Sequence, residues 1–214
     1  MKQGHPDYIV VEGPIGVGKT TLAKRLAKTF NTELMLELAA ENPFLPRFYS
    51  DPKSVALPTQ LFFLFQRAKQ LEALRQTDMF KPVQVSDFLI EKDKLFASVT
   101  LDDYELALYH QVYDRLTLDS PVPDLVIYLQ APIDILMQRI IERGHDYERP
   151  INRSYLKKIS EAYVEFFYHY TTAPLLIVNT NDFDLSGNDS DYNLLLEHIS
   201  HLPPGRHYFN PIEL

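Results

Sequence analysis

Short apolar runs alternate with longer amphipathic stretches along almost the whole chain. The runs of strand length lie at Tyr8–Val11, Leu34–Leu36, Pro82–Val85, Leu125–Leu129 and Leu175–Val178. Segments with a helical spacing of apolar residues lie between and after them, at Lys19–Phe30, within Leu57–Gln76, and at Leu101–Leu116, Ile133–Arg143, Ser154–Tyr170 and Tyr192–His201. Strands that alternate with helices are typical of a parallel sheet covered by helices. The pattern therefore predicts an α/β fold with a five-stranded parallel sheet and helices on both faces.

The same pattern indicates one folding unit over residues 1–214. The polar, weakly patterned stretch Asn179–Asp191 is typical of a loop late in the chain. No sequence repeat of about 20 to 50 residues is visible, which excludes a solenoid. We expect one domain that ends in a short tail over about residues 203–214.

Composition narrows the classes of partner. The chain has 214 residues, of which 45% are hydrophobic, enough for a sizeable core. A formal net charge of -8 argues against binding nucleic acid or an anionic membrane mainly through electrostatics. The absence of cysteine excludes disulfides and thiolate metal sites and fits a reducing compartment. With no apolar stretch of about 18 residues and no signal peptide pattern, we expect a soluble cytoplasmic protein without nucleic-acid or membrane partners.

A phosphate-binding loop follows the first predicted strand directly. It reads Gly13-Pro14-Ile15-Gly16-Val17-Gly18-Lys19-Thr20-Thr21. This is a full match to G-x-x-x-x-G-K-[ST], whose backbone N–H groups surround phosphate oxygens at a helix N-terminus. Lys19 would reach the β- and γ-phosphates, and Thr20 would hold Mg²⁺. Since an accidental match arises only about once per hundred chains of this length, the loop predicts binding of a nucleoside triphosphate.

The phosphate loop alone does not separate kinases from GTPases or motor ATPases. A GTPase would carry N-K-x-D after a strand, but the nearest segment, Asn179-Thr180-Asn181-Asp182, lacks the lysine. A motor ATPase would carry an apolar strand that ends in an acid, for which Val85-Ser86-Asp87 is the candidate. Motifs further along the chain must therefore identify the class.

The segment after the second predicted strand carries the most informative motif. Glu37 is followed by Asn42-Pro43-Phe44-Leu45 and by Phe48-Tyr49-Ser50-Asp51-Pro52. With the phosphate loop, this segment resembles the deoxynucleoside kinases, particularly bacterial deoxyadenosine and deoxyguanosine kinases, with Leu38 in place of the family's proline. The resemblance implies a P-loop kinase fold, a substrate-binding Tyr49, and a Glu37 carboxylate that accepts the proton of the sugar 5′-hydroxyl. The alternative for Glu37 is a solvated acid at the end of a strand.

The next predicted helix carries Gln60 and Arg67 on one face, because seven residues make about two helical turns. The family resemblance implies that the Gln60 amide reads the nucleobase and that Arg67 pairs with an acid after the third strand, here Asp93. The aromatic residues Phe62, Phe63 and Phe65 could stack on a base, although helical spacing of aromatics is more often typical of a core.

Resemblance to the family continues into a lid over about residues 139–150. It implies that Arg139 and Arg143 close over the triphosphate, that Glu148 and Tyr155 belong to the substrate site, and that Asp182 and Phe183 lie in the loop that holds the adenine of ATP. Arginine suits this role because its forked donors match phosphate oxygens. The alternative is that the two arginines, four residues apart, form ion pairs along a helix.

The chain departs from the family after the third strand. The family carries D-R-S or E-R-S there, with the acid near Mg²⁺ and the arginine on the reacting phosphate and the base. Asp87 keeps the acid, but Phe88 replaces the arginine, and the third lid position holds His145. Loss of such an arginine can cost several powers of ten in rate unless another cation substitutes. Lys92 and Arg149 are the cations nearby in the sequence.

These observations predict an enzyme that transfers the γ-phosphate of ATP, with Mg²⁺, to the 5′-hydroxyl of a purine deoxynucleoside in nucleotide salvage. Two alternatives stay open: a catalytically weak nucleotide-binding or regulatory relative, and a nucleoside monophosphate kinase, which would need further arginines for the acceptor phosphate. The resemblance also implies a homodimer formed through helices. The apolar stretches Leu101–Leu116 and Tyr163–Tyr170 would supply that interface, unless they are core.

Overall fold

A parallel β-sheet forms the centre of the molecule. The computed structural model describes residues 6–76, 84–181, 185 and 187–210. Within these residues the sheet has six strands in the order β2-β3-β1-β4-β5-β6, and every neighbouring pair is parallel. The strands are β1 (Tyr8–Glu12), β2 (Glu33–Met35), β3 (Gln84–Ser86), β4 (Leu125–Gln130), β5 (Leu175–Asn179) and β6 (Arg206–Phe209). The predicted parallel α/β fold is confirmed, with one strand more than expected.

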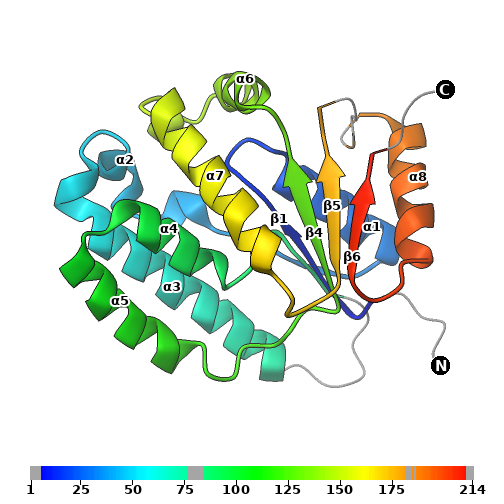
Figure 1. Cartoon of the computed structure of the whole chain (residues 1–214), viewed down its shortest axis with the longest axis horizontal. Helices are drawn as coiled ribbons and strands as arrows, with labels where there is room; N and C mark the ends of the chain where they lie inside the picture. The colour runs from blue at the N-terminus through cyan, green and yellow to red at the C-terminus, as the bar shows by residue number, and fades with distance from the viewer. Residues whose placement is uncertain (1–5, 77–83, 182–184, 186, 211–214) are drawn as a thin grey trace.

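Helices cover both faces of the sheet, as Figure 1 shows. They are α1 (Lys19–Phe30), α2 (Leu45–Phe48), α3 (Pro52–Gln76), α4 (Lys92–Thr100), α5 (Asp103–Leu116), α6 (Ile133–Arg143), α7 (Arg153–His169) and α8 (Asp189–Ser200), with the 3₁₀ turns η1 (Ala39–Glu41) and η2 (Asp146–Glu148). In the described residues, no helix is both long and apolar enough to cross a membrane.

Alternation along the strands divides the core into two layers. Ile9 and Val11 of β1 pack on the side of α1, α6 and α8, whereas Val10 packs on the side of α4 and α7. Such alternation follows from the strand period of two residues. A third cluster joins α3, α4 and α5 on the outside of the second layer. Strands β1, β4 and β5 are buried almost throughout, so their sequences are continuous apolar runs, which made them easy to recognise.

Besides the 3₁₀ turns, three elements were not expected from the sequence: the four-residue helix α2, strand β6 and helix α4. The predicted tail contains β6, which pairs with β5 from Leu175 opposite Arg206 to Val178 opposite Phe209. Within β6 only Phe209 is a buried apolar residue, so the hydrophobic pattern of this edge strand is weak. Helix α4 was also missed, because its inward positions include Lys92 and Asp93, which interrupt the apolar pattern of a helix. The charged interior of α4 is part of the site described next.

Candidate active site

Two cavities meet at the phosphate loop. The donor cavity, named for the expected phosphate donor, has a volume of about 990 Å³ and is lined by α1, α6 and the end of β5. The acceptor cavity has a volume of about 360 Å³ and is lined by the Glu37 segment, α3, α4 and α7. Five residues line both cavities: Gly16, Lys19, Thr20, Arg143 and His145. A group bound in one cavity would therefore reach a group bound in the other at the phosphate loop.

Two glycines of the phosphate loop are required by close packing. A Cβ atom on Gly13 would lie 2.5 Å from the carbonyl oxygen of Leu129 in β4, and one on Gly16 would lie 2.8 Å from the carbonyl oxygen of Leu136 in α6. Both glycines also have positive φ, of 149° and 84°. The loop is thus held between β4 and α6, and it leads into α1.

Lys19 is held at the loop itself. Its Nζ donates to the carbonyl oxygens of Gly13, at 2.7 Å, and Pro14, at 3.2 Å. Burial lowers the pKa of the Lys19 ammonium. Lys19 therefore lies at the junction of the two cavities, where the sequence predicted it would meet phosphate.

The two residues expected to hold Mg²⁺ lie together. The Thr20 hydroxyl donates to Asp87 Oδ2 at 2.6 Å, and Asp87 Oδ1 accepts from the backbone N–H of Glu37 at 2.7 Å. Burial raises the pKa of the Asp87 carboxyl. Hard oxygen ligands of this kind fit Mg²⁺. Since the described residues contain no cluster of three or more His, Asp or Glu side chains that could hold a metal, phosphate oxygens and water would complete its shell.

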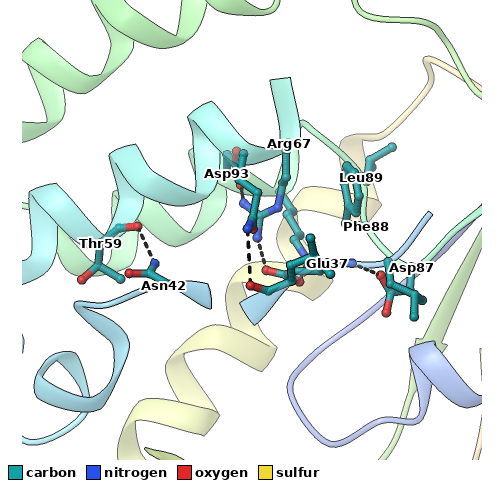
Figure 2. Close-up of polar contacts among 12 residues, drawn as sticks. Glu37, Asn42, Thr59, Arg67, Asp87, Phe88, Leu89 and Asp93 are labelled. Carbon is teal, nitrogen blue, oxygen red and sulfur yellow. Dashed lines mark hydrogen bonds and ion pairs between the residues drawn. The ribbon is translucent and has the colours of Figure 1, made fainter. Parts of the chain in front are cut away.

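Glu37 lies between two cations at the wall of the acceptor cavity. Its carboxylate accepts hydrogen bonds from Arg67 and, at 2.7 Å, from Nζ of Lys92. Figure 2 shows Arg67 between the carboxylates of Glu37 and Asp93, and it pairs with both. The pair with Asp93 was expected from the family resemblance, whereas the pair with Glu37 was not predicted. Burial alone would raise the pKa of Glu37, but the charges of Arg67 and Lys92 outweigh it and hold the pKa well below its usual range. The side chain is therefore an ionised carboxylate, not a solvated acid at a strand end.

Glu12 is a further member of this site that sequence reasoning missed. It is fully buried at the end of β1, 3.7 Å from Nζ of Lys92. Its carboxylate accepts from the N–H groups of Gly13 and Leu89, both at 2.8 Å, and from the hydroxyl of Tyr163 at 2.9 Å. One signal was present in the sequence: a carboxylate at the end of an apolar strand, directly before the phosphate loop.

Gln60 lines the acceptor cavity with a fixed orientation. Its Nε2 donates to the hydroxyl oxygen of Thr100 at 3.2 Å, and that hydroxyl donates to the carbonyl oxygen of Phe96 at 2.7 Å. Because the Thr100 proton is already used, its oxygen must accept, and this fixes which end of the Gln60 amide faces Thr100. Of the three aromatic residues around it, Phe63 lines the cavity, whereas Phe65 is 54% exposed.

The other substrate residues predicted from the sequence also line the acceptor cavity. The rings of Tyr49 and Tyr155 meet edge to face, with centroids 6.0 Å apart. The buried hydroxyl of Tyr155 has no hydrogen-bond partner within the part of the chain that is described. A ligand hydroxyl would satisfy it, since buried polar groups are normally paired. Glu148 accepts two hydrogen bonds from Arg143, from Nε at 3.0 Å and from Nη2 at 2.6 Å.

The two predicted lid arginines differ in position. Arg143 lines both cavities, but Arg139 lines the donor cavity alone and donates to the carbonyl oxygens of Val17 and Thr180 and to the Thr180 hydroxyl. Arg139 therefore ties the phosphate loop to the end of β5. The expected adenine contacts Asp182 and Phe183 lie outside the described residues.

The two cations considered as substitutes for the family's arginine also differ. Lys92 contacts Glu37, whereas the Arg149 side chain is 77% exposed and pairs with Asp146 at 2.8 Å. Phe88 is fully buried in the cluster of α3 and α5, with Leu64 and Tyr109 among its neighbours. Figure 2 shows its ring on the side of Arg67 away from Asn42 and Thr59. The position where the family has its arginine is thus part of the hydrophobic core, and the cation Lys92, from another position, reaches Glu37.

Known proteins similar to this chain agree with the geometry. A model of the deoxynucleoside kinase family matches residues 9–202. Deoxyguanosine kinase of Bacillus subtilis (strain 168) is 36% identical over 201 residues, which cover 91% of this chain and 97% of that protein. Deoxyadenosine/deoxycytidine kinase of the same organism is 28% identical over 211 residues, covering 94% and 96%. The solved structure of deoxyadenosine kinase from M. mycoides with bound dATP is similar in fold, with a TM-score of 0.79 at 24% identity over 90% of this chain and 98% of that one.

Proposed function

The chain belongs to the deoxynucleoside kinase family, and we propose that it transfers the γ-phosphate of ATP to the 5′-hydroxyl of a purine deoxynucleoside in nucleotide salvage. The observation that carries this proposal is the junction of the two cavities. Lys19, Thr20 and Arg143 line both, and the ionised Glu37 lines the acceptor side. Phosphoryl transfer needs this arrangement, since donor and acceptor must meet in line while the developing charge is neutralised.

The mechanism assigns one task to each group at the junction. ATP lies in the donor cavity, with its phosphates on the N–H groups of the loop and on Lys19. The deoxynucleoside lies in the acceptor cavity, with its base at Gln60 and its sugar at Tyr49 and Tyr155. Glu37 accepts the 5′-hydroxyl proton as the oxygen bonds to the γ-phosphorus, and the bond to the β-phosphate oxygen breaks to release ADP.

A divalent cation completes the donor side. Thr20 and Asp87 would hold Mg²⁺ there, and the ion would neutralise charge on the β- and γ-phosphates. The proposal is supported by the 2.6 Å contact between the two side chains, which come from the first turn of α1 and from the residue directly after β3.

The acceptor cavity favours a nucleoside over a nucleotide acceptor. Arg67 is paired with Glu37 and Asp93, Lys92 with Glu37 and Glu12, and Arg143 with Glu148. An acceptor phosphate would need cations that are not already neutralised by carboxylates. A purine base is favoured because the relative that is 36% identical is named for deoxyguanosine, and the relative that is 28% identical is named for deoxyadenosine as well as deoxycytidine.

The experiment that tests this function compares acceptors side by side. The purified chain with ATP and Mg²⁺ is incubated with deoxyguanosine, deoxyadenosine, deoxycytidine or dTMP, and products are separated by chromatography. We expect purine 5′-monophosphates, and no product from an analogue without the 5′-hydroxyl. Phosphorylation of dTMP alone would identify a monophosphate kinase, and binding of both ligands without turnover would identify a weak relative.

Assembly and location complete the proposal. We infer a cytoplasmic homodimer: the chain has no cysteine, and α5 and α7 keep Tyr104, Leu108, Val164 and Tyr168 at the surface. Exposed apolar side chains grouped on helices are typical of an interface. Sedimentation of the wild type and of Leu108→Glu measures this directly, with a dimer expected for the first and a monomer for the second.

A further inference from the structure

Lys92 breaks two rules of local structure. Its ammonium group is almost completely buried, with 2% of the side chain exposed, although a buried charge must be desolvated. It is also the first residue of α4, where the helix dipole disfavours a cation. Violations of this kind are typical of functional positions, because stability alone would select a different residue.

Two carboxylates, those of Glu37 and Glu12, hold the ammonium group of Lys92 in the site. Nζ lies 2.7 Å from Glu37 Oε2 and 3.7 Å from Glu12 Oε2. Glu12 cannot move easily, because it accepts hydrogen bonds from the phosphate loop, from the segment after β3 and from α7. The ammonium is thus held between a structural carboxylate and the proposed base.

Lys92 also lines the acceptor cavity, together with Lys19, Thr20 and Asp87. The other candidate cations have different partners. Arg139 is bound to the carbonyl oxygens of Val17 and Thr180, and Arg149 is paired with Asp146 at the surface. Arg67 also contacts Glu37, but it is paired with Asp93 as well. Lys92 donates a hydrogen bond to Glu37 alone, and its second carboxylate partner, Glu12, is 3.7 Å away.

We propose that Lys92 is the acceptor-side cation of phosphoryl transfer, which turns the Glu37 carboxylate toward the 5′-hydroxyl and then compensates charge on the transferred group. This inference rests on the proposed function. In the resting site Lys92 is paired with Glu37 at 2.7 Å and with Glu12 at 3.7 Å. When Glu37 takes the proton of the 5′-hydroxyl it becomes neutral, the O5′–P bond forms and the bond to the ADP oxygen breaks. The ammonium then keeps only the more distant Glu12 as a charged partner, and its charge interacts with the phosphoryl oxygens, where negative charge gathers.

The test compares Lys92→Met, which keeps length without charge, with Lys92→Arg, which keeps charge. Lys94→Met is the matched control, since Lys94 is on the same helix, half exposed and paired with Asp114. We measure kcat and KM for deoxyguanosine, ATP and deoxynucleoside affinity by calorimetry, and thermal unfolding. For Lys92→Met we expect kcat to fall by about a hundredfold or more, with both affinities within about threefold. Lys92→Arg should recover kcat to within about tenfold, and Lys94→Met should match wild type.

Other results would overturn the proposal. A folded Lys92→Met with kcat within about threefold of wild type refutes it, and so does equal loss in Lys92→Met and Lys92→Arg when both bind their ligands. If Lys92→Met fails to fold, the double variant Glu12→Gln/Lys92→Met, which removes one charge of each sign, takes its place with the same expected loss. The proposed function fails separately, if the wild type phosphorylates no deoxynucleoside at all.

Discussion

The donor and acceptor cavities are built in opposite ways. The loop side of the donor cavity comes from one continuous segment, residues 16–21, whose backbone N–H groups are expected to bind the phosphates. The polar side of the acceptor cavity is built on a network of charged side chains from four separate elements. Glu37 after β2, Arg67 of α3 and Lys92 of α4 line the cavity, and Glu12 of β1 and Asp93 of α4 pair with them.

This difference has a physical consequence for how each cavity tolerates change. A backbone cradle depends on glycine and on a helix N-terminus, so only a few side chains in it carry chemistry. A buried charge network depends on every member, because removal of one charge leaves its partner buried and unpaired. Single substitutions should therefore act locally on the donor side and spread through several residues on the acceptor side.

Lys19→Ala tests the donor side with the largest expected effect. In the described structure the hydrogen bonds of Lys19 go to the loop carbonyls, so its loss should leave the fold intact and lower kcat by roughly a thousandfold or more. Steady-state kinetics with deoxyguanosine, beside thermal unfolding, provides the measurement. Lys28→Ala, an exposed lysine on the same helix, is the control and should be unchanged. If Lys19→Ala turned over at the wild-type rate, the assignment of this loop as the phosphate-binding site would be wrong.

Glu37→Gln tests the acceptor side in the same assay. The amide keeps the size of the carboxylate but cannot accept the proton, so kcat should fall by about a hundredfold or more while deoxynucleoside affinity stays within a few fold. Because Arg67 and Lys92 then lose a charged partner, thermal stability should also fall, unlike that of Lys19→Ala. Glu41→Gln, at an exposed acid of η1, is the matched control. If Glu37→Gln kept both normal turnover and normal stability, the charge network would have no role.

The same contrast explains what the sequence could and could not predict. The phosphate loop was recognised completely, because its residues are contiguous and each has a local reason to be there. Glu37, Gln60, Arg67 and Asp93 were placed from family motifs. The structure brings the first three to one cavity and pairs Asp93 with Arg67. Glu12 was missed, since nothing local shows that it meets a residue from α4.

Phe88 shows the limit of motif comparison most clearly. Its position in the motif raised the possibility that the chain had lost a necessary cation. In the structure the ring is in the core, while a lysine four residues later reaches the base. Spacing along the chain could name Lys92 as a candidate but could not choose between it and Arg149. That choice depends on how the segment after β3 turns into α4, which is a tertiary feature.

Arg143→Ala and Arg139→Ala test the boundary between the two cavities. Arg143 lines both, so its loss should lower kcat by roughly tenfold to a hundredfold. Arg139 joins the phosphate loop to Thr180, so its loss should mainly raise KM for ATP and lower the unfolding temperature. Arg149→Ala serves as the control because that side chain is exposed. A larger kcat loss in Arg139→Ala than in Arg143→Ala would place Arg139, and not Arg143, at the reacting phosphate.

Of these variants, Thr100→Val should have the smallest effect on the kinetics, and it should affect the deoxynucleoside alone. Thr100 lies behind Gln60, and its hydroxyl oxygen accepts the hydrogen bond that fixes the orientation of the Gln60 amide. Valine has nearly the same shape but accepts no hydrogen bond, which removes about 1 kcal/mol of preference for one orientation. KM for the deoxynucleoside should rise by roughly fivefold, with kcat and KM for ATP nearly unchanged.

Discrimination between deoxyguanosine and deoxyadenosine should narrow, because the two bases present opposite donor and acceptor patterns to the amide. Thr100→Ser keeps the hydroxyl, so it should restore both KM for the deoxynucleoside and the preference between the two bases. If Thr100→Val changed KM for ATP instead, the donor and acceptor cavities would not be as separate as their construction indicates.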